Sequence, residues 1–208
     1  MDTRERILDS AQRLIQTRSF HGFCFQDIAN EVGIRKPSVF HYFDSKDELA
    51  VAVLQHAADW VVAQLQEADA LDPAARLQRY FDMFGTIHGK GERMCPLGSF
   101  GALFDAISPP VQRALHQHTK WHFDWLERVV RDGVAQGQFA IGDQRPRDVA
   151  LQIFASVQGA LLTGRLATDP HVIEQIGAAL RRYLGCADAQ ARASDGPRAS
   201  ARPRKPAH

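Results

Sequence analysis

Apolar residues recur every three or four positions along almost the whole chain, which is the spacing of one face of an α-helix. No segment alternates apolar and polar residues with the period of two that marks a half-buried strand. The pattern predicts short helices in the first 45 residues, then helical segments at about residues 45–65, 73–88, 100–107, 111–137, 147–166 and 170–184. The predicted fold class is therefore all-α.

A helix-turn-helix motif is indicated by the segment from Phe25 to Phe43. Ala29 is small enough to let a second helix cross the first, and Gly33 accepts the left-handed backbone that the turn needs. The apolar residues expected to fill the seam behind the motif are Ile28, Val32, Ile34, Val39 and Phe40. The donors that the second helix would present to phosphates and base edges, with one just beyond it, are Arg35, Lys36, Ser38, His41, Tyr42 and Lys46.

The run DIANEVGIRKPSVFHYFDSKDEL resembles the N-terminal DNA-binding domain of TetR-family transcriptional regulators, and TRERILDSAQRLI is similar to that family's first helix. The resemblance covers about residues 3–54 and implies a three-helix DNA-binding domain at residues 1–48. It implies that a helix over residues 36–43 enters the major groove, with DNA faced by Lys36, Ser38, His41 and Tyr42 and phosphates held by Tyr42 and Lys46. Cys24 and Pro37 depart from the family pattern, which usually has a Ser or Thr and a small residue at these positions.

The same resemblance implies that residues 49–186 form an effector-binding and dimerisation domain, whose last two helices pair with those of a second copy. Residues 149–164 carry no charged side chain and are apolar around most of the helix circumference. Such a helix must bury more than one face, either against a partner or, as the alternative, inside one core. The predicted homodimer interface consists of Val157, Gly159, Leu161, Ile173, Ile176, Leu180 and Tyr183, and the small residues Gly159, Ala160 and Gly164 would permit close approach.

An aromatic-rich interior with a few polar groups predicts a small-molecule pocket, and the resemblance implies an effector site among the fifth to eighth helices. The candidate lining residues are Phe81, Phe84, His88, Phe100, Phe104, His118, Trp121, His122, Trp125, Phe154 and Gln158. For any one of them, ordinary core packing is the alternative. His118 and His122 have the spacing of two metal ligands on one helix, but two histidines make an incomplete site, so we expect neither a metal nor another cofactor.

The three cysteines are an odd number, which indicates a reducing compartment rather than a disulfide framework. Cys95 lies in the segment MCPLG, which is similar to a segment found in a subset of the family, some of whose members respond to electrophiles or oxidants. An exposed thiol with a lowered pKa at this position would be a redox sensor. The alternative is a small apolar residue packed under the loop, and Cys24 and Cys186 are expected to be structural.

Composition changes this interpretation little. The chain has 208 residues, 45% of them hydrophobic and 24% charged, with a net charge of +1, which is typical of a soluble globular protein. A charge near zero does not itself indicate nucleic-acid binding, so a few positioned side chains would have to neutralise phosphates. The charged N-terminus lacks the apolar core of a signal peptide, so we expect a cytoplasmic protein without membrane contacts. Residues 187–208 have five basic side chains and no Val, Ile, Leu, Phe or Tyr, and are expected to form a disordered basic tail.

Together these features predict a homodimeric repressor that leaves a palindromic operator in double-stranded DNA when a small-molecule effector binds. One alternative is a repressor that responds to electrophiles or oxidants through Cys95. Another is a non-specific architectural DNA-binding protein, which would need no aromatic pocket. An enzyme is not expected, because the sequence has no nucleophile elbow, phosphate-binding loop, dinucleotide fingerprint or complete set of metal ligands.

Overall fold

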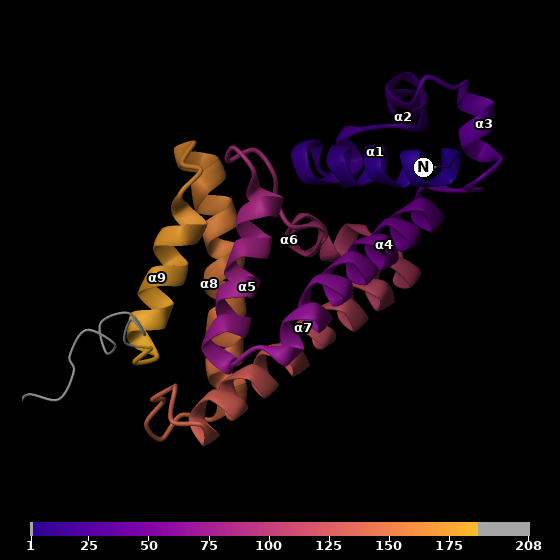
Figure 1. The fold of residues 1–208 in the computed structure, drawn as a ribbon. Helices are drawn as coiled ribbons and strands as arrows, with labels where there is room; N and C mark the ends of the chain where they lie inside the picture. The colour runs from indigo at the N-terminus through magenta and orange to yellow at the C-terminus, as the bar shows by residue number, and fades with distance from the viewer. Residues whose placement is uncertain (1, 187–208) are drawn as a thin grey trace, which may run out of the picture.

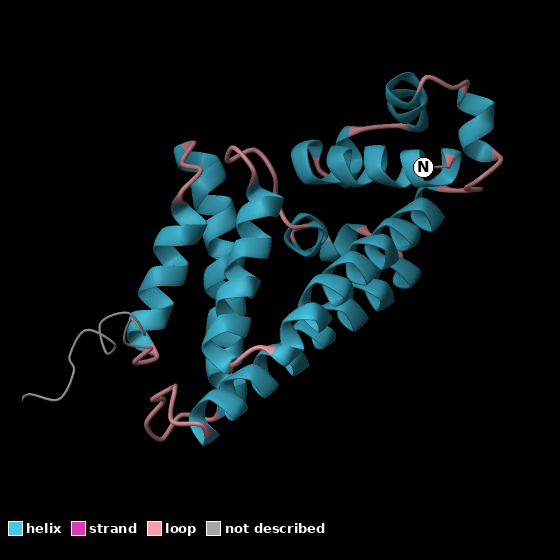
Figure 2. Cartoon of the chain, viewed as in Figure 1, coloured by secondary structure: helices cyan, strands magenta, loops and turns pink. Residues whose placement is uncertain are grey.

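A computed structural model describes residues 2–186, and the predicted tail at residues 187–208 lies outside the described residues. Within the described part all regular structure is helical, as Figure 2 shows, which confirms the predicted fold class. The α-helices are α1 (Thr3–Arg18), α2 (Phe25–Val32), α3 (Lys36–Phe40), α4 (Lys46–Gln66), α5 (Pro73–His88), α6 (Pro96–Gly101), α7 (Pro109–Ala135), α8 (Pro146–Ala167) and α9 (Val172–Tyr183). Short 3₁₀ turns are η1 (Phe20–Gly22), η2 (Glu67–Ala70) and η3 (Phe104–Ala106).

Local sequence signals account for the ends of the first helices. Asp2 and Glu5 form a capping box at the start of α1, in which each carboxylate accepts the other residue's backbone N–H. Gly33 ends α2 with a φ of 74°, and its N–H donates to the carbonyl of Ala29 at 3.0 Å. The left-handed backbone at Gly33 turns the chain directly into α3.

The helix predicted over residues 36–43 is shorter in the structure, because α3 ends at Phe40 and His41 and Tyr42 form a turn. Val39 and Phe43 point inward and are fully buried. Phe40, predicted to fill the seam, instead has 46% of its surface exposed. Val39 and Phe43 are four residues apart, about one helical turn, so both side chains point into the domain. Phe40 follows Val39 directly and therefore points to a different side, where it is exposed.

α4 joins the two parts of the molecule. The Ser45 side chain accepts the N–H of Glu48 at 3.1 Å and starts this helix, as predicted. α4 packs against α1 and against α7, and Figure 1 shows α4 and α7 running side by side away from the α1–α3 domain. A displacement of α4 relative to α7 would therefore move the DNA-binding helices.

The core of the second part is built around stacked aromatic rings. Tyr80 on α5 and Trp125 on α7 lie parallel with centroids 5.7 Å apart, and Phe84 contacts Tyr80 at 4.9 Å. α8 packs between α7 and α9, and its Gly164 allows that packing. A Cβ at Gly164 would lie 2.4 Å from Cγ1 of Val172 and 2.5 Å from Nε2 of His88. The close approach expected of Gly164 is thus made inside one chain rather than to a partner.

The C-terminal end of α1 is fastened to the second part of the molecule. The backbone N–H of Met94, in the loop before α6, donates to the carbonyl of Gln16 at 3.1 Å. The Arg165 guanidinium, in the last turn of α8, donates to the carbonyls of Gln16 at 3.2 Å and Thr17 at 2.7 Å. These bonds satisfy carbonyls that a helix end leaves free, so α1 and α8 are directly linked.

α8 is the one described helix that is long and apolar enough, by length and composition, to cross a membrane. The core helix of a globular protein passes the same test. In this structure α8 packs against α7 on one side and α9 on the other, which accounts for the apolar residues on its buried sides.

Candidate DNA-binding surface and ligand cavity

The DNA-facing side chains predicted on α3 lie at the surface. Arg35, Lys36, His41 and Tyr42 are exposed, and Ser38 is half-buried. The His41 and Tyr42 rings meet edge to face with centroids 5.4 Å apart. The motif therefore presents charged, hydroxyl and imidazole groups together at the corner where α3 ends.

Phe40 belongs to this surface and was missed at the sequence level. Its ring meets Phe25 edge to face at 4.8 Å, and the Lys36 ammonium lies 6.0 Å from its centroid. The one-turn spacing of Val39 and Phe43 was the signal that could have placed Phe40 outside the seam. An exposed ring among polar donors is suited to contact the methyl group of thymine.

Lys46, predicted to hold a phosphate, makes its contacts inside the domain. Its ammonium donates to the carbonyl of Phe23 and lies 4.2 Å and 4.8 Å from the ring centroids of Phe23 and Phe20. Burial lowers the pKa of Lys46, although Cys24 and Asp27 act in the opposite direction. Lys46 therefore fastens the loop between α1 and α2, which distinguishes it from the freely exposed Lys36.

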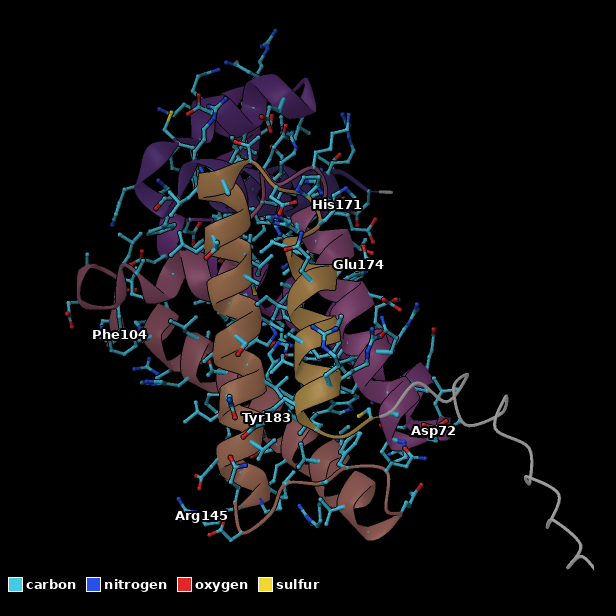
Figure 3. All side chains as sticks on the ribbon, turned by 90° about the vertical axis from the view of Figure 1, so that its left-hand side faces the viewer. Asp72, Phe104, Arg145, His171, Glu174 and Tyr183 are labelled. Atoms are coloured by element: carbon cyan, nitrogen blue, oxygen red, sulfur yellow. The ribbon has the colours of Figure 1, made fainter. Side chains whose placement is uncertain are left out.

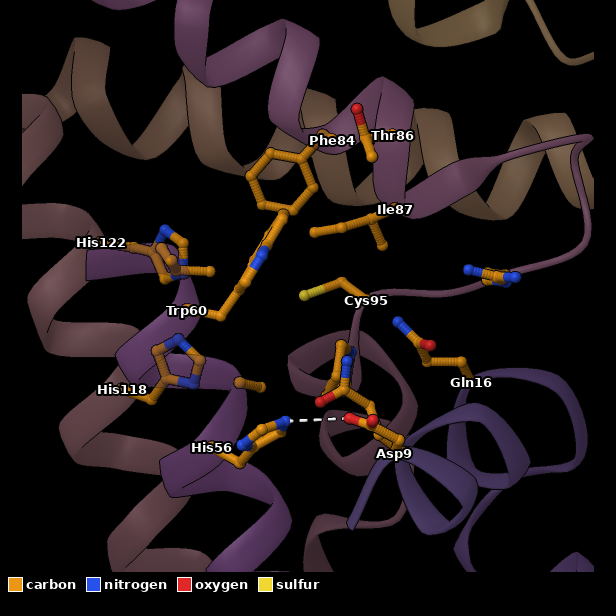
Figure 4. Close-up of a pocket in the computed structure, with 15 residues that line it drawn as sticks. Asp9, Gln16, His56, Trp60, Phe84, Thr86, Ile87, Cys95, His118 and His122 are labelled. Carbon is orange, nitrogen blue, oxygen red and sulfur yellow. Dashed lines mark hydrogen bonds and ion pairs between the residues drawn. The ribbon is translucent and has the colours of Figure 1, made fainter. Parts of the chain in front are cut away.

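A cavity of about 240 Å³ lies between α1, α4, α5, α7 and the loop before α6 (Figure 4). It is lined by Asp9, Gln12, Gln16, His56, Ala57, Trp60, Val61, Phe84, Thr86, Ile87, Arg93, Cys95, Pro96, His118 and His122. Of the predicted pocket residues it includes Phe84, His118 and His122. The contribution of α1 to the cavity was not predicted, because the effector site was expected only among the fifth to eighth helices and α1 was assigned only to DNA binding.

The two cavity histidines on α7 are buried and neutral. His118 is 5% exposed and His122 is fully buried, and their rings stack with centroids 5.1 Å apart. Burial lowers the pKa of His118 to about 4, and burial together with the neighbouring His118 lowers the pKa of His122 to about 3. Nδ1 of His122 lies 3.3 Å from the Tyr80 hydroxyl, whereas Nε2 of His122 and both nitrogens of His118 have no hydrogen-bond partner within residues 2–186.

A polar bridge between the two domains borders the same cavity. Nε2 of His56 on α4 lies 3.1 Å from Oδ1 of Asp9 on α1, as the dashed line in Figure 4 marks. Both side chains are partly exposed. In the same view, His118 and His122 lie on one side of the cavity and Gln16 lies on the other.

The other predicted pocket residues lie outside this cavity, since helical periodicity identifies inward residues but not those that border a void. Trp125 and Phe100 are packed in the core, and the indole of Trp125 donates to Asp69 at 3.3 Å. Phe81 lies in an open groove between α5 and α9, and Trp121 borders a separate hollow of about 130 Å³ between α4 and α7. The remainder pack against neighbours: His88 lies 3.3 Å from two backbone carbonyls, Phe104 contacts His116, Phe154 contacts His122, and Gln158 lies beside Cys95.

Cys95 does not have the exposed thiol with a lowered pKa that redox sensing requires. Cys95 is buried, and burial raises its pKa, although hydrogen bonds from Leu97, Gln158 and Gly98 offset part of the rise. Burial also raises the pKa of the half-buried Cys186. Cys24, expected to be structural, is exposed at the start of α2, where its N–H donates to Asp27 at 2.7 Å. The structure therefore disfavours a sensor based on Cys95.

Most predicted dimer contacts face the inside of the chain. Val157, Leu161, Ile173 and Leu180 are buried in the core and cannot contact a partner without opening it, while Ile176 is half-buried and Gly159 and Tyr183 are exposed. The outer side of α8 and α9 faces the viewer in Figure 3. Its exposed apolar side chains are Leu151, Leu162, Leu166 and Tyr183. Because α8 is apolar nearly all round, its pattern did not reveal which side faced outward.

Comparison with known proteins agrees with both parts of this architecture. The model for bacterial regulatory proteins of the TetR family matches residues 7–53, and a tetracyclin repressor-like C-terminal domain matches residues 73–180. An uncharacterised HTH-type transcriptional regulator in the lacX 3' region of Lactococcus lactis is 26% identical over 83% of this chain and 88% of its own length. The HTH-type transcriptional repressor DhaR of a Mycobacterium species is 24% identical over 83% of this chain and 87% of its own length.

A solved structure shows the same arrangement of helices. The crystal structure of a TetR transcriptional regulator from Legionella pneumophila superposes with a TM-score of 0.80 and 26% sequence identity. The superposition covers 88% of this chain and 98% of that one. With matches to both domains and to the whole arrangement of helices, this chain belongs to the TetR family of DNA-binding transcriptional regulators.

Proposed function

We propose that this protein is a homodimeric, cytoplasmic repressor that a small-molecule effector releases from a palindromic operator. The observation that carries the proposal is the cavity that has one wall on α1 and the others on α4, α5 and α7. A molecule bound there contacts the DNA-binding domain and the second part of the chain together. If the cavity's shape differs between the DNA-bound and free forms, an effector that prefers the free form weakens DNA binding.

A dimer is supported by the exposed apolar side chains on the outer side of α8. Leu151, Leu162 and Leu166 are 52%, 50% and 79% exposed. With Ala155 and Gly159 between them they form a continuous stripe at intervals of three or four residues. A stripe of this kind on a helix that is already packed on its other sides is suited to pair with the same stripe of a second copy.

Two copies related by a twofold axis would present two α3 helices to one face of the duplex, about 34–36 Å apart along its axis. Arg35, Lys36, Ser38 and His41 are placed to contact base edges and phosphates, Tyr42 to contact a phosphate, and Phe40 to contact a thymine methyl. Repression is favoured over activation by the relative DhaR, which is named a repressor and aligns with 83% of this chain.

The architectural alternative predicts a different result in a direct experiment. The full chain is incubated with a pool of random duplexes, the bound fraction is amplified, and the recovered sequences are tested by gel shift at several salt concentrations. We expect one palindromic sequence, bound at least a thousandfold more tightly than unrelated DNA. Equal affinity for every duplex, with steep salt dependence, would favour the architectural protein and overturn the proposal.

The oligomeric state is tested separately by sedimentation. Leu162→Arg places a charge in the exposed stripe and is expected to give a monomer that no longer binds the full palindrome tightly. Leu71→Arg is the matched control, because Leu71 is 44% exposed but lies between η2 and α5 and is not part of the α8 stripe. A Leu162→Arg variant that still sediments as a dimer would contradict the proposed interface.

A further inference from the structure

The cavity between α1 and α7 contains polar atoms that the chain itself does not satisfy. Both nitrogens of His118, Nε2 of His122 and Oε1 of Gln12 are buried without hydrogen-bond partners among the described residues. All three residues line the cavity, His118 and His122 from α7 and Gln12 from α1. Unpaired buried polar atoms reduce the stability of a fold. Four of the eight such atoms in the described part of the chain border this one cavity, which indicates that a bound molecule satisfies them.

These atoms offer hydrogen bonds without charge. A neutral imidazole has one N–H donor and one bare nitrogen acceptor, and the amide oxygen of Gln12 is an acceptor. Burial keeps both imidazoles neutral at pH 7, with pKa values of about 4 and 3. A charged group placed against them would lose its water without meeting an opposite charge on α7. The end of the ligand that contacts α7 is therefore uncharged and can both donate and accept.

The size and the walls of the cavity limit the rest of the ligand. A cavity of about 150 Å³ can hold benzene, so the volume of about 240 Å³ found here suits one or two rings. Trp60 and Phe84 provide aromatic walls, and Val61 and Ile87 provide aliphatic ones (Figure 4). Aromatic walls favour an aromatic ligand through offset or edge-to-face packing.

We propose that this cavity binds an uncharged aromatic compound of one or two rings with a hydroxyl group that hydrogen-bonds to His118 and His122. The opposite end of the molecule reaches Gln12 and Gln16 on α1, where a donor group would satisfy Oε1 of Gln12. This inference rests on the proposed function and names the chemical class of its effector. It also gives a direct route of regulation. The ligand touches α1 itself, whose C-terminal end is fastened to Met94 and Arg165, so occupancy changes the position of the DNA-binding domain within one protomer.

Phenol and toluene provide the first test, because they have the same ring and nearly the same size but only phenol has a hydroxyl group. Titration calorimetry of the full chain is expected to show phenol binding at least tenfold more tightly than toluene. Benzoate, which carries a charge, is expected to bind most weakly. Equal affinity for phenol and toluene, or tighter binding of benzoate, would overturn the proposal.

A variant series tests the residues. His118→Phe removes two unpaired nitrogens and keeps an aromatic ring, so phenol affinity is expected to fall about tenfold while toluene affinity is kept. His116→Phe is the matched control, because His116 lies on the same helix and is exposed. Gln12→Leu tests the α1 wall independently, with a smaller loss expected, and serves if His118→Phe does not fold. Unchanged phenol binding in the folded variants would overturn the assignment.

Two further measurements separate the possible failures. Zn²⁺ alone is tested as a competitor of phenol. If Zn²⁺ displaced phenol from the wild type but not from His118→Phe, the cavity would be assigned to a metal ion and the proposed aromatic ligand would be wrong. Gel shifts without any ligand test the proposed function by itself. Specific DNA binding with no phenol binding would overturn this inference alone, whereas phenol binding with no specific DNA binding would overturn the proposed function alone.

Discussion

The polar groups on the exposed side of α3 are surrounded by water, whereas those in the cavity next to α1 are buried. At the start of α3, the side chains of Arg35 and Lys36 are exposed to water. In the cavity, His118 and His122 are buried and neutral. Charged side chains that bind DNA phosphates release counterions, so their contribution to affinity depends on salt. Buried neutral groups instead recognise a partner by hydrogen bonds and shape.

α1 is the element that the two regions share. It packs against α2 in the DNA-binding domain, and its Asp9, Gln12 and Gln16 border the cavity. A regulator built in this way can tune DNA affinity and ligand affinity almost independently, because different physical interactions govern them. The proposed coupling between the two runs through α1 and through α4, which also lines the cavity and packs against α1.

Salt concentration should give the largest difference between the two regions, because it should affect operator affinity far more than phenol affinity. Between 50 mM and 200 mM salt we expect operator affinity to fall by about 10³-fold or more, as for a protein with six to ten phosphate contacts. Phenol affinity should change by less than about twofold, because phenol and the two histidines that it contacts are uncharged. Gel shifts and calorimetry in the same buffers measure both quantities. A parallel loss of phenol affinity would show that charge does contribute to the cavity.

Acid should act on the cavity region through stability. Unfolded histidines bind protons near pH 6.5, whereas folded His118 and His122 do so only near pH 4 and 3. Between these values the unfolded chain holds more protons, so the free energy of unfolding falls as the pH falls. From pH 7 to pH 5 the loss is roughly 2 kcal/mol for each histidine. Urea unfolding at both pH values measures it.

His118→Phe provides the internal control for that experiment. This variant removes one of the two histidines with a lowered pKa, so the fall in the free energy of unfolding should be about half that of the wild type. The variant should also be at least as stable at pH 7, because its phenyl ring leaves no nitrogen unpaired. The same fall in wild type and variant would contradict the burial of His118 as its cause.

Within the α3 surface, single substitutions should distinguish base contacts from phosphate contacts. Lys36→Ala or His41→Ala should change base preference at one operator position, by about 1–3 kcal/mol. Tyr42→Ala should instead weaken binding to all sequences and leave the salt dependence unchanged, because the tyrosine hydroxyl carries no charge. Binding-site selection with each variant measures this. Identical changes in all three variants would show that the assigned roles are wrong.

Family resemblance implies that Lys46, like Tyr42, contacts a phosphate of the DNA. In the structure, however, the Lys46 ammonium donates to the carbonyl of Phe23 and lies over the Phe23 ring, inside the domain. We therefore expect the effect of Lys46→Ala on DNA binding to combine a lost phosphate contact with a loosened loop between α1 and α2. Thermal unfolding of this variant should show a lower melting temperature, which Tyr42→Ala should not. An unchanged melting temperature would favour a phosphate contact alone.

The two regions also differ in how far the sequence could predict them. The DNA-binding motif lies within about 25 consecutive residues, and Gly33, Ser45 and the spacing of Val39 and Phe43 determine it locally. The donors on α3 could therefore be identified without a structure. The position predicted for Phe40 was wrong because Val39 and Phe40 are adjacent and both apolar, and only the one-turn spacing from Val39 to Phe43 distinguishes the inward residue from its neighbour.

The cavity and the outer side of α8 depend on contacts between distant segments. Gln12 and His118 are more than 100 positions apart, and no periodicity indicates that they border one void. For α8, apolar residues nearly all round the helix gave no direction, so the predicted interface included Val157 and Leu161, which are buried, and not Leu162 and Leu166, which are exposed and belong to the proposed interface. Periodicity reports which residues avoid water, but not whether a core, a partner or a ligand excludes it.

The smallest expected effect concerns the link between α8 and α1. Arg165→Ala removes the guanidinium bonds to the carbonyls of Gln16 and Thr17, and so loosens the end of α1. Phenol would still bind the cavity, but its displacement of α1 would be transmitted less completely to α3. The coupling free energy is obtained from the ratio of the operator affinities measured without and with phenol. We expect Arg165→Ala to lower this coupling free energy by about 0.5–2 kcal/mol. Arg182→Ala, on the exposed side of α9, is the matched control. If Arg165→Ala left that ratio unchanged while Gln12→Leu reduced it, α1 would be coupled to the ligand alone and not to α8.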